Sequence, residues 1–398
     1  MNKKEEKLRK KNSKEKSIKK DAKILNKKIK KPKIDRNENK NIKKNTIIEI
    51  DNKNINNYTT NPSDLNESID LVEDSYIFDY SNNNDTFDLF ESIDNIFYLV
   101  YSNNKKSIIS FNIIENKKIN EIKNAHDSFI THFRHCFDQA NHRDLILSIS
   151  SRDRNIKIWN INKIECILNL NNIYDTGYIY SACFLNYNGE TFIVTSNYKY
   201  SSQDDDDYIK VFNLKGDKIK DINDSKESIF FIDTYYDDKK DNIFIIITTN
   251  KYIKTYIYNI NVLYHKYYKN IISKYKDSEY KYVLINNFTK TLKIIESTNN
   301  GNIRIWDFHS GRLLKNIKVS ALKINGICLW NNEYLLACTD YFAIKIIKLK
   351  YNNYNYLFTQ LNTLRTIKKF IHPKYGECLI VQGVDNHIRL YIKKQLKY

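Results

Sequence analysis

Residues 145–161 read Leu-Ile-Leu-Ser-Ile-Ser-Ser-Arg-Asp-Arg-Asn-Ile-Lys-Ile-Trp-Asn-Ile. The first seven form an apolar, strand-like run, and residues 152–155 form a polar turn. From Ile156 onward, apolar and polar residues alternate with a period of two, as they do along a strand buried on one face. Two such runs joined by a short polar turn predict a β-hairpin. A run at residues 165–170 and an earlier strand near residues 129–133 extend the predicted hairpin to four strands.

The spacing between Ile156 and Trp159 in this hairpin recurs along the chain. Seven aromatic or aliphatic anchors, 41 to 53 residues apart, each follow an isoleucine by three residues. The anchors are Phe111, Trp159, Phe212, Tyr256, Trp306, Ile347 and Tyr391. Six units also carry Lys or Arg two residues before the anchor: Lys157, Lys210, Lys254, Arg304, Lys345 and Arg389. A repeat of this length is typical of stacked or circular arrays, so we predict an all-β fold of seven repeated sheets.

The unit resembles the WD40 repeat, whose four-stranded sheets form the blades of β-propellers. Ala125-His126 stands where that family has Gly-His, and Trp159-Asn160 stands where it has Trp-Asp. The chain has one literal Trp-Asp pair, Trp306-Asp307. The resemblance covers about residues 75–398 and implies a seven-bladed WD40-like β-propeller.

The resemblance also implies a hydrogen-bonded chain that fixes each blade. In the second unit this chain would consist of His126, a strand serine, Asp153 and Trp159, with either Ser148 or Ser150 as the serine. The position six residues before the anchor is Asp in only three of the seven units, which are Asp153, Asp206 and Asp385. The motif is therefore strongest in the second unit and in the fifth, which contains Trp306 and Asp307.

The last unit is too short to supply its own outer strand, because only seven residues follow Tyr391. An open sheet edge would promote aggregation. We therefore expect residues 75–80 to fill this position from the N-terminal side, with residues 46–50 as the alternative. The predicted domains are a basic arm at 1–45, a polar and acidic linker at 46–74, and a propeller at 75–398 closed by an N-terminal strand.

Charge is distributed in blocks along the chain. Residues 1–45 carry 20 Lys and Arg against 6 Asp and Glu, whereas residues 54–104 carry ten acids and no base. Residues 105–398 carry 44 bases and 29 acids. Charged blocks of this kind are typical of solvated interaction tails.

The basic arm has too few apolar residues to form a core, and we predict that it is disordered. Its candidate nuclear-import or acidic-partner residues are Lys27, Lys28, Lys30, Lys31 and Lys33. The same residues could contact RNA phosphates. The arm has no aromatic residue, so base stacking is not available to it. Two alternatives are a contact with the acidic segment at 64–94 and a tail that only reflects the Asn-, Lys- and Ile-rich composition.

The six cysteines form no Cys-x-x-Cys pair and fall mostly in apolar runs, as expected of free thiols in a reducing compartment. The chain has no apolar signal region and no run of membrane-span length. We expect a soluble intracellular protein, either cytoplasmic or nuclear and nucleolar, that is a monomer within a larger complex.

The sequence predicts no catalytic site, no metal and no cofactor. The chain has eight glycines and contains no glycine-rich phosphate loop. His132-x-x-His135-Cys136 resembles a zinc-binding spacing, but neighbouring residues on a strand point to opposite faces. No second ligand pair occurs elsewhere, so we predict no metal site here and interpret the nearby His126 as the structural histidine of its unit.

The candidate partner-binding rim lies in the loops on the His126 side of the units. It consists of Arg152, Arg154, Asp204, Asp205, Asp206, Asp207, Asn299 and Asn300. The tyrosine pair Tyr235-Tyr236 lies near a turn, and we attribute it to strand composition rather than to a binding face.

The family resemblance implies a non-enzymatic scaffold for protein–protein interactions within a multi-protein complex. The alternative is an RNA-associated component of a nuclear or nucleolar ribonucleoprotein assembly, such as a ribosome-maturation particle. The basic arm and the basic body motivate this alternative.

Overall fold

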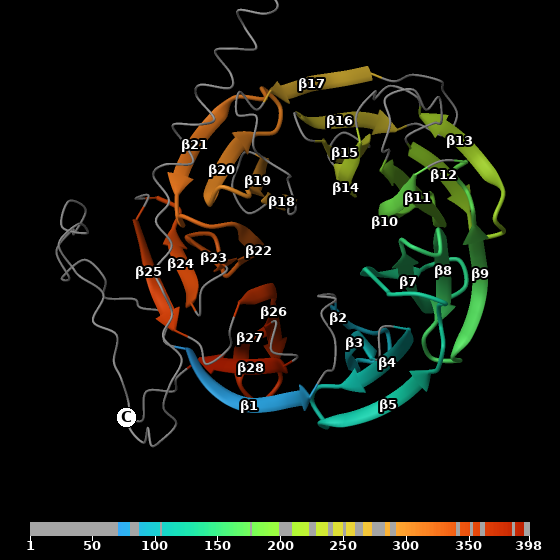
Figure 1. Cartoon of the computed structure of the whole chain (residues 1–398), viewed down its shortest axis with the longest axis horizontal. Coiled ribbons are helices and arrows are strands. Elements are labelled where there is room, and N and C mark those ends of the chain that lie inside the picture. Colours follow the sequence, from blue (N-terminus) through green and yellow to red (C-terminus); the bar gives the residue numbers. More distant parts are fainter. Residues whose placement is uncertain are drawn as a thin grey trace, which may run out of the picture. The chain divides into compact units, whose positions relative to one another are not determined.

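The computed structural model describes residues 71–79, 87–103, 106–175, 177–198, 209–222, 228–237, 242–249, 252–258, 266–272, 283–286, 292–339, 343–350, 353–358, 363–383 and 387–393 (Figure 1). All of them belong to the compact unit Glu67–Tyr398. The basic arm, with Lys27, Lys28, Lys30, Lys31 and Lys33, lies outside these residues. All regular secondary structure in the described part of the chain is β-strand.

The strands form seven four-stranded antiparallel sheets, a pattern consistent with propeller blades. The first sheet contains β2 (Phe87–Glu91), β3 (Phe97–Asn103), β4 (Ser107–Asn112) and β5 (Lys117–Ile122). The second contains β6 (His132–Asp138), β7 (Arg143–Ser150), β8 (Asn155–Asn160) and β9 (Glu165–Asn171). The third contains β10 (Tyr178–Tyr187), β11 (Glu190–Tyr198), β12 (Ile209–Asn213) and β13 (Lys218–Ile222).

The later sheets repeat this order of strands. The fourth contains β14 (Ile229–Asp237), β15 (Asn242–Thr249), β16 (Tyr252–Tyr258) and β17 (Lys266–Ile272). The fifth contains β18 (Val283–Asn286), β19 (Lys293–Ser297), β20 (Asn302–Asp307) and β21 (Leu313–Lys318). The sixth contains β22 (Ile324–Leu329), β23 (Tyr334–Thr339), β24 (Ala343–Lys348) and β25 (Asn353–Phe358).

The seventh sheet combines the two ends of the unit. It contains β26 (Leu364–His372), β27 (Gly376–Gly383) and β28 (His387–Lys393), and its fourth strand is β1 (Leu71–Asp79). β1 pairs antiparallel with β28, from Leu71 opposite Lys393 to Asp79 opposite His387 (Figure 1). The segment predicted for this position, residues 75–80, overlaps β1, and its last residue, Tyr80, lies outside the described residues. The alternative segment at 46–50 also lies outside them.

All seven anchors lie on the third strand of their sheets and are buried. Their strands are β4, β8, β12, β16, β20, β24 and β28. The first strand of the second sheet begins later than expected, at His132 rather than near residue 129. The reason lies in the preceding loop, where the Ser128 N–H donates to Asp153 Oδ2 at 2.8 Å and so ties the backbone to the turn between β7 and β8.

The core is divided among the spaces between neighbouring sheets. In each space, an anchor packs against residues of the preceding sheet, as Trp159 does against Val100 and Ile108. Phe111 of the first sheet shares a cluster with Phe370 and Cys378 of the seventh. Burial of a large side chain in each space contributes about 1.5–3 kcal/mol per residue, so the anchors stabilise the contacts between sheets.

The strand order gives every sheet two different ends. We call "rim end" the end with the turns from second to third strand, and "cavity end" the end with the turns from first to second and from third to fourth. At the rim end, Gly301 has a φ of +76° in the turn before β20, and a Cβ there would lie 2.1 Å from the Ser320 carbonyl oxygen. Only glycine fits such a position.

Candidate functional site

In the second sheet, three of the four expected motif residues, His126, Ser148 and Trp159, are joined by hydrogen bonds. His126 lies in the loop before β6 with its side chain fully buried, and its Nε2 is 2.7 Å from Ser148 Oγ. Trp159 Nε1 donates to the same oxygen at 2.8 Å. The serine in this chain is therefore Ser148 rather than Ser150.

Burial, helped by Lys157, lowers the pKa of His126 to about 4, so its imidazole is neutral at pH 7. Ser148 Oγ thus bonds both the indole N–H and the His126 ring. His126 Nδ1 lies 3.9 Å from Asp153 Oδ2, beyond hydrogen-bond length, and this oxygen accepts the Ser128 N–H instead. Lys157 completes the set, since its Nζ donates to the Ala125 carbonyl at 2.7 Å.

The third sheet repeats this arrangement with other residue types. Tyr174 takes the position of His126, and its hydroxyl lies 2.8 Å from Thr195 Oγ1, which stands where Ser148 does. Lys210 donates to the Ile173 carbonyl at 2.8 Å, as Lys157 does to Ala125. Tyr174 was not predicted, because it is not a His and lies 36 residues before Lys210, whereas His126 lies 31 residues before Lys157.

In the fifth sheet the same positions hold an ion pair. Glu296 and Arg304 face each other across β19 and β20 as Ser148 and Lys157 do across β7 and β8. Arg304 Nη1 lies 3.1 Å from Glu296 Oε1, and both side chains are almost fully buried. Burial raises the pKa of Glu296 to about 7, against the lowering effect of Arg304 and of the Trp306 indole. The Trp306 N–H lies close to this carboxyl without reaching hydrogen-bond geometry.

The residue after the anchor has a local role in the turn between third and fourth strands. Asp307 Oδ1 accepts the Ser310 N–H at 2.7 Å. In the first three sheets an asparagine accepts an equivalent bond, for example Asn160 Oδ1 from the Asn162 N–H at 3.2 Å. Both side chains can accept such a bond, which explains why Asn replaces the Asp of the Trp-Asp pair.

The structure places four of the eight rim residues, and they lie at the rim end of two sheets. Arg152 is exposed over the ring of Phe129, with Cζ 5.1 Å from its centroid. Arg154 Nη1 donates to the Asp175 carbonyl at 3.4 Å. Asn299 and Asn300 are half-buried, and Asn300 Oδ1 accepts the side-chain N–H of Asn302 within its own turn. Asp204, Asp205, Asp206 and Asp207 lie outside the described residues.

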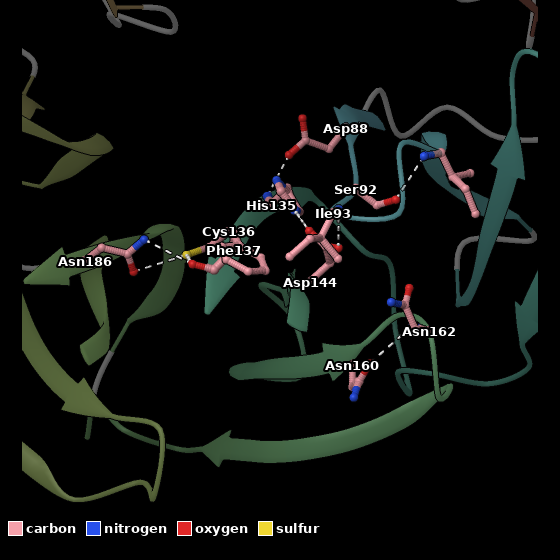
Figure 2. Close-up of polar contacts among 11 residues, drawn as sticks. Asp88, Ser92, Ile93, His135, Cys136, Phe137, Asp144, Asn160, Asn162 and Asn186 are labelled. Atoms are coloured by element: carbon pink, nitrogen blue, oxygen red, sulfur yellow. Dashed lines mark hydrogen bonds and ion pairs between the residues drawn. The ribbon is translucent and has the colours of Figure 1, made fainter. Parts of the chain in front are cut away.

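A cavity of about 360 Å³ opens at the cavity end, where no site was predicted. It lies among the first strands of the second, third and fourth sheets. Its lining includes Arg134, His135, Cys136, Cys183, Asn186 and Asp233. Cys136 Sγ donates to Asn186 Oδ1 at 3.3 Å, a bond that joins the second and third sheets (Figure 2).

A polar network beside this cavity joins three sheets. Asp88 on β2 forms an ion pair with Lys368 on β26, and its Oδ2 accepts the His135 N–H on β6 at 2.8 Å. Burial alone would raise the pKa of Asp88, but Lys368 and Arg134 hold it below its ordinary value. His135 Nε2 also lies 2.8 Å from Asp144 Oδ1 (Figure 2). This histidine thus has structural partners on two sheets.

The cysteines of the described residues are all free thiols. Burial raises the pKa of Cys136 to about 11, and the pKa of Cys183 lies well above its usual value for the same reason. Both thiols therefore stay protonated at neutral pH and are poor metal ligands. The described residues contain no group of three His, Cys, Asp or Glu side chains placed to hold a metal ion.

No family model matches this chain, and none of the curated proteins matches its sequence. In the described part of the chain, no helix has the length and apolar character needed to cross a membrane.

Proposed function

We propose that this protein is a closed seven-bladed WD40-like β-propeller that acts as a non-enzymatic scaffold for protein–protein interactions within a multi-protein complex. The observation that carries the proposal is the repeated buried polar set in the second, third and fifth sheets. Each set links the second and third strands of its sheet close to the rim end. In the second and third sheets it also ties down the loop that enters the sheet, through His126 and Tyr174. Loops held by a rigid framework are suited to binding.

Closure of the propeller is supported by an N-terminal strand within the last sheet and by two contacts between the first and last sheets. β1 pairs with β28, Phe111 packs with Phe370, and Asp88 pairs with Lys368. A ring closed in this way leaves no long unpaired strand edge. Deletion of Leu71–Asp79 should therefore expose the β28 edge and cause aggregation, measured by light scattering at a temperature where the full chain stays monomeric.

The second candidate function is association with RNA in a nuclear or nucleolar ribonucleoprotein assembly. The observation that favours it is the charge of residues 1–45, with 20 bases against 6 acids. Phosphate contacts made by such a segment weaken steeply as salt concentration rises. Salt-sensitive binding of RNA would therefore require residues 1–45, whereas binding of a protein partner at the propeller would not require them.

Proximity labelling in cells separates the two candidates. The full chain is compared with a variant lacking residues 1–45, each with and without RNase. The scaffold proposal predicts a discrete set of labelled proteins that survives RNase and loss of the arm. RNase-sensitive, arm-dependent labelling of ribosomal or nucleolar proteins would instead establish the ribonucleoprotein function.

A further inference from the structure

The exposed large apolar residues of the described chain are concentrated at the cavity end. Nine such side chains are exposed, and eight of them lie in, or within two residues of, a turn at that end. These eight are Ile93, Ile114, Ile164, Ile219, Tyr236, Leu313, Leu314 and Ile371. The ninth, Leu322, lies at the rim end. Scattered exposed apolar residues are ordinary, but here eight of the nine lie at the same end of the sheets.

Tyr236 is the one residue that belongs both to the cavity lining and to these eight exposed apolar residues. This side chain lines the cavity and is 50% exposed. Contacts between neighbouring sheets keep the cavity ends in register. Examples are the bond from the Ile93 N–H to Asp144 Oδ2 at 3.1 Å and the bond from Thr234 Oγ1 to the Phe184 carbonyl at 2.7 Å. The apolar residues of neighbouring sheets thus share one end of the unit with the mouth of the cavity.

The cavity lining contains one acid, Asp233, and one base, Arg134, which form no ion pair in the described structure. Asp233 Oδ1 accepts the Thr234 N–H at 2.9 Å, and in the described structure no ion pair joins this carboxylate to a base. The nearest lining base, Arg134, is turned onto the Phe231 ring, with Cζ 5.5 Å from the centroid, and donates to its neighbouring carbonyl of Phe133. Burial raises the pKa of Asp233, and Arg134 and Lys368 offset this only in part. This half-buried carboxylate would attract a further cation entering the cavity.

The cavity wall indicates which cation fits. Phe137, Phe184 and Leu185 are apolar, and the thiols of Cys136 and Cys183 are protonated. A bare metal ion would find one carboxylate and neutral sulfur, because His135 and Asn186 already bond Asp144 and Cys136. This is a poor ligand set. A Lys or Arg side chain matches better, because its apolar stem can lie along the wall while its charged head reaches Asp233.

We propose that the cavity end is a docking surface for a partner segment with apolar side chains around one Lys or Arg, whose cation enters the cavity beside Asp233. This inference rests on the scaffold function and assigns its partner class and its face. That face is opposite to the rim of Arg152 and Asn299.

Selection of a random-peptide phage library on the immobilised full chain tests the proposal. Enriched peptides should carry one Lys or Arg among apolar residues. A synthetic copy of the best peptide is then titrated by fluorescence anisotropy, beside a copy with citrulline or norleucine at the basic position. The uncharged copy should bind about tenfold more weakly or worse, because it leaves Asp233 without its partner.

Substitutions in the chain locate the binding face. Asp233→Asn should weaken the basic peptide about tenfold and abolish its advantage over the uncharged copy. Tyr236→Ser should weaken both peptides. Asp94→Asn removes an exposed carboxylate from the same end, and Leu322→Ser removes an exposed apolar side chain from the opposite end, so both should leave affinity unchanged. Thermal unfolding checks that each variant is folded.

The outcomes separate this inference from the scaffold proposal. Peptides that bind equally well to Asp233→Asn, or a selection without basic residues, would overturn the cavity-end surface. Binding lost on Arg152→Ala but kept in Asp233→Asn would move the site to the rim end and leave the scaffold proposal standing. A chain that enriches no peptide and labels no RNase-resistant protein set would contradict both.

Discussion

The second and fifth sheets place different polar groups at the same position on the second strand, next to a buried tryptophan. In both, a tryptophan on the third strand is buried to 6% exposure and faces a polar side chain on the second strand. The second sheet uses a neutral chain from Trp159 through Ser148 to His126. The fifth uses a buried ion pair of Glu296 and Arg304. The strand register is the conserved element of the repeat, and the polar group that fills it can vary.

The largest effect should come from removing either anchor. Trp159→Ala and Trp306→Ala should each lower the free energy of unfolding by about 3–5 kcal/mol, because each leaves a cavity between two sheets. The matched variants Trp159→Phe and Trp306→Phe sharpen the comparison. Trp159→Phe also removes a hydrogen bond to Ser148, so it should cost about 1 kcal/mol more than Trp306→Phe. Urea unfolding monitored by circular dichroism measures both pairs, and equal costs for the two Phe variants would contradict the assigned bonding.

Breaking the ion pair should be nearly as damaging. Glu296→Gln leaves Arg304 buried without a counter-charge and should cost about 3 kcal/mol. The double variant Glu296→Leu with Arg304→Met should be closer to the wild type, because it removes both charges and keeps the volume. Urea unfolding of the single and double variants decides this. A double variant less stable than Glu296→Gln would show that the pair itself stabilises the sheet.

The sequence predicts those parts of the fold and site whose residues recur at a fixed spacing along the chain. The anchors and their isoleucines were found because they recur at a fixed spacing, and Ser148 was one of two serines that fitted. Tyr174 and Glu296 occupy the positions of His126 and Ser148 in their sheets. They were missed because a motif of His and Ser specifies residue types, whereas the strand register specifies only positions. The cavity was missed for another reason. Arg134, Cys183 and Asp233 come from three different units, and nothing in one unit indicates that their side chains meet.

The two sheets should respond to acid in opposite directions. The pKa of His126 falls from 6.5 to about 4 on folding, so its contribution to stability is complete above pH 6.5 and is lost as the pH falls through 4. The pKa of Glu296 rises from 4.5 to about 7, so its contribution is complete below pH 4.5 and is lost as the pH rises through 7. Each contribution is at most about 3 kcal/mol.

Single substitutions separate the opposing contributions of His126 and Glu296 to the free energy of unfolding between pH 4 and 7. His126→Gln should make the protein relatively more stable in acid, because one acid-sensitive term is gone. Glu296→Gln should make it relatively less stable in acid. The measurement is the free energy of unfolding at four pH values for wild type and both variants, and parallel pH profiles would refute the assignment.

Ser148→Ala should have an intermediate effect. It leaves the Trp159 indole N–H and His126 Nε2 buried without a partner, at a cost of about 2 kcal/mol. Thr195→Ala in the third sheet is the matched control. Thr195 Oγ1 contacts the Tyr174 hydroxyl and donates to the Lys210 carbonyl. The anchor of this sheet, Phe212, has no polar hydrogen, so no indole N–H is left without a partner and the cost should be about half as large. Equal destabilisation of the two variants in urea would show that the indole bond contributes nothing.

The smallest effects concern Lys157 and Lys210, which a strand pattern alone predicts to be dispensable, solvent-facing residues. Each instead donates to a backbone carbonyl in the loop before its sheet, at 2.7 and 2.8 Å. Both are only partly buried, so Lys157→Ala and Lys210→Ala should each cost about 1 kcal/mol. The bond holds a loop rather than the core, and loss of it should therefore appear first as faster amide exchange at Asp127 and Ser128. The matched control is Lys163→Ala in an exposed turn, which should change neither stability nor exchange. In both sheets the lysine joins this loop to the third strand. Equal effects of Lys157→Ala and Lys210→Ala would mean that the bond stabilises the loop with either His126 or Tyr174 next to it. A large difference would mean that its contribution depends on that neighbouring ring.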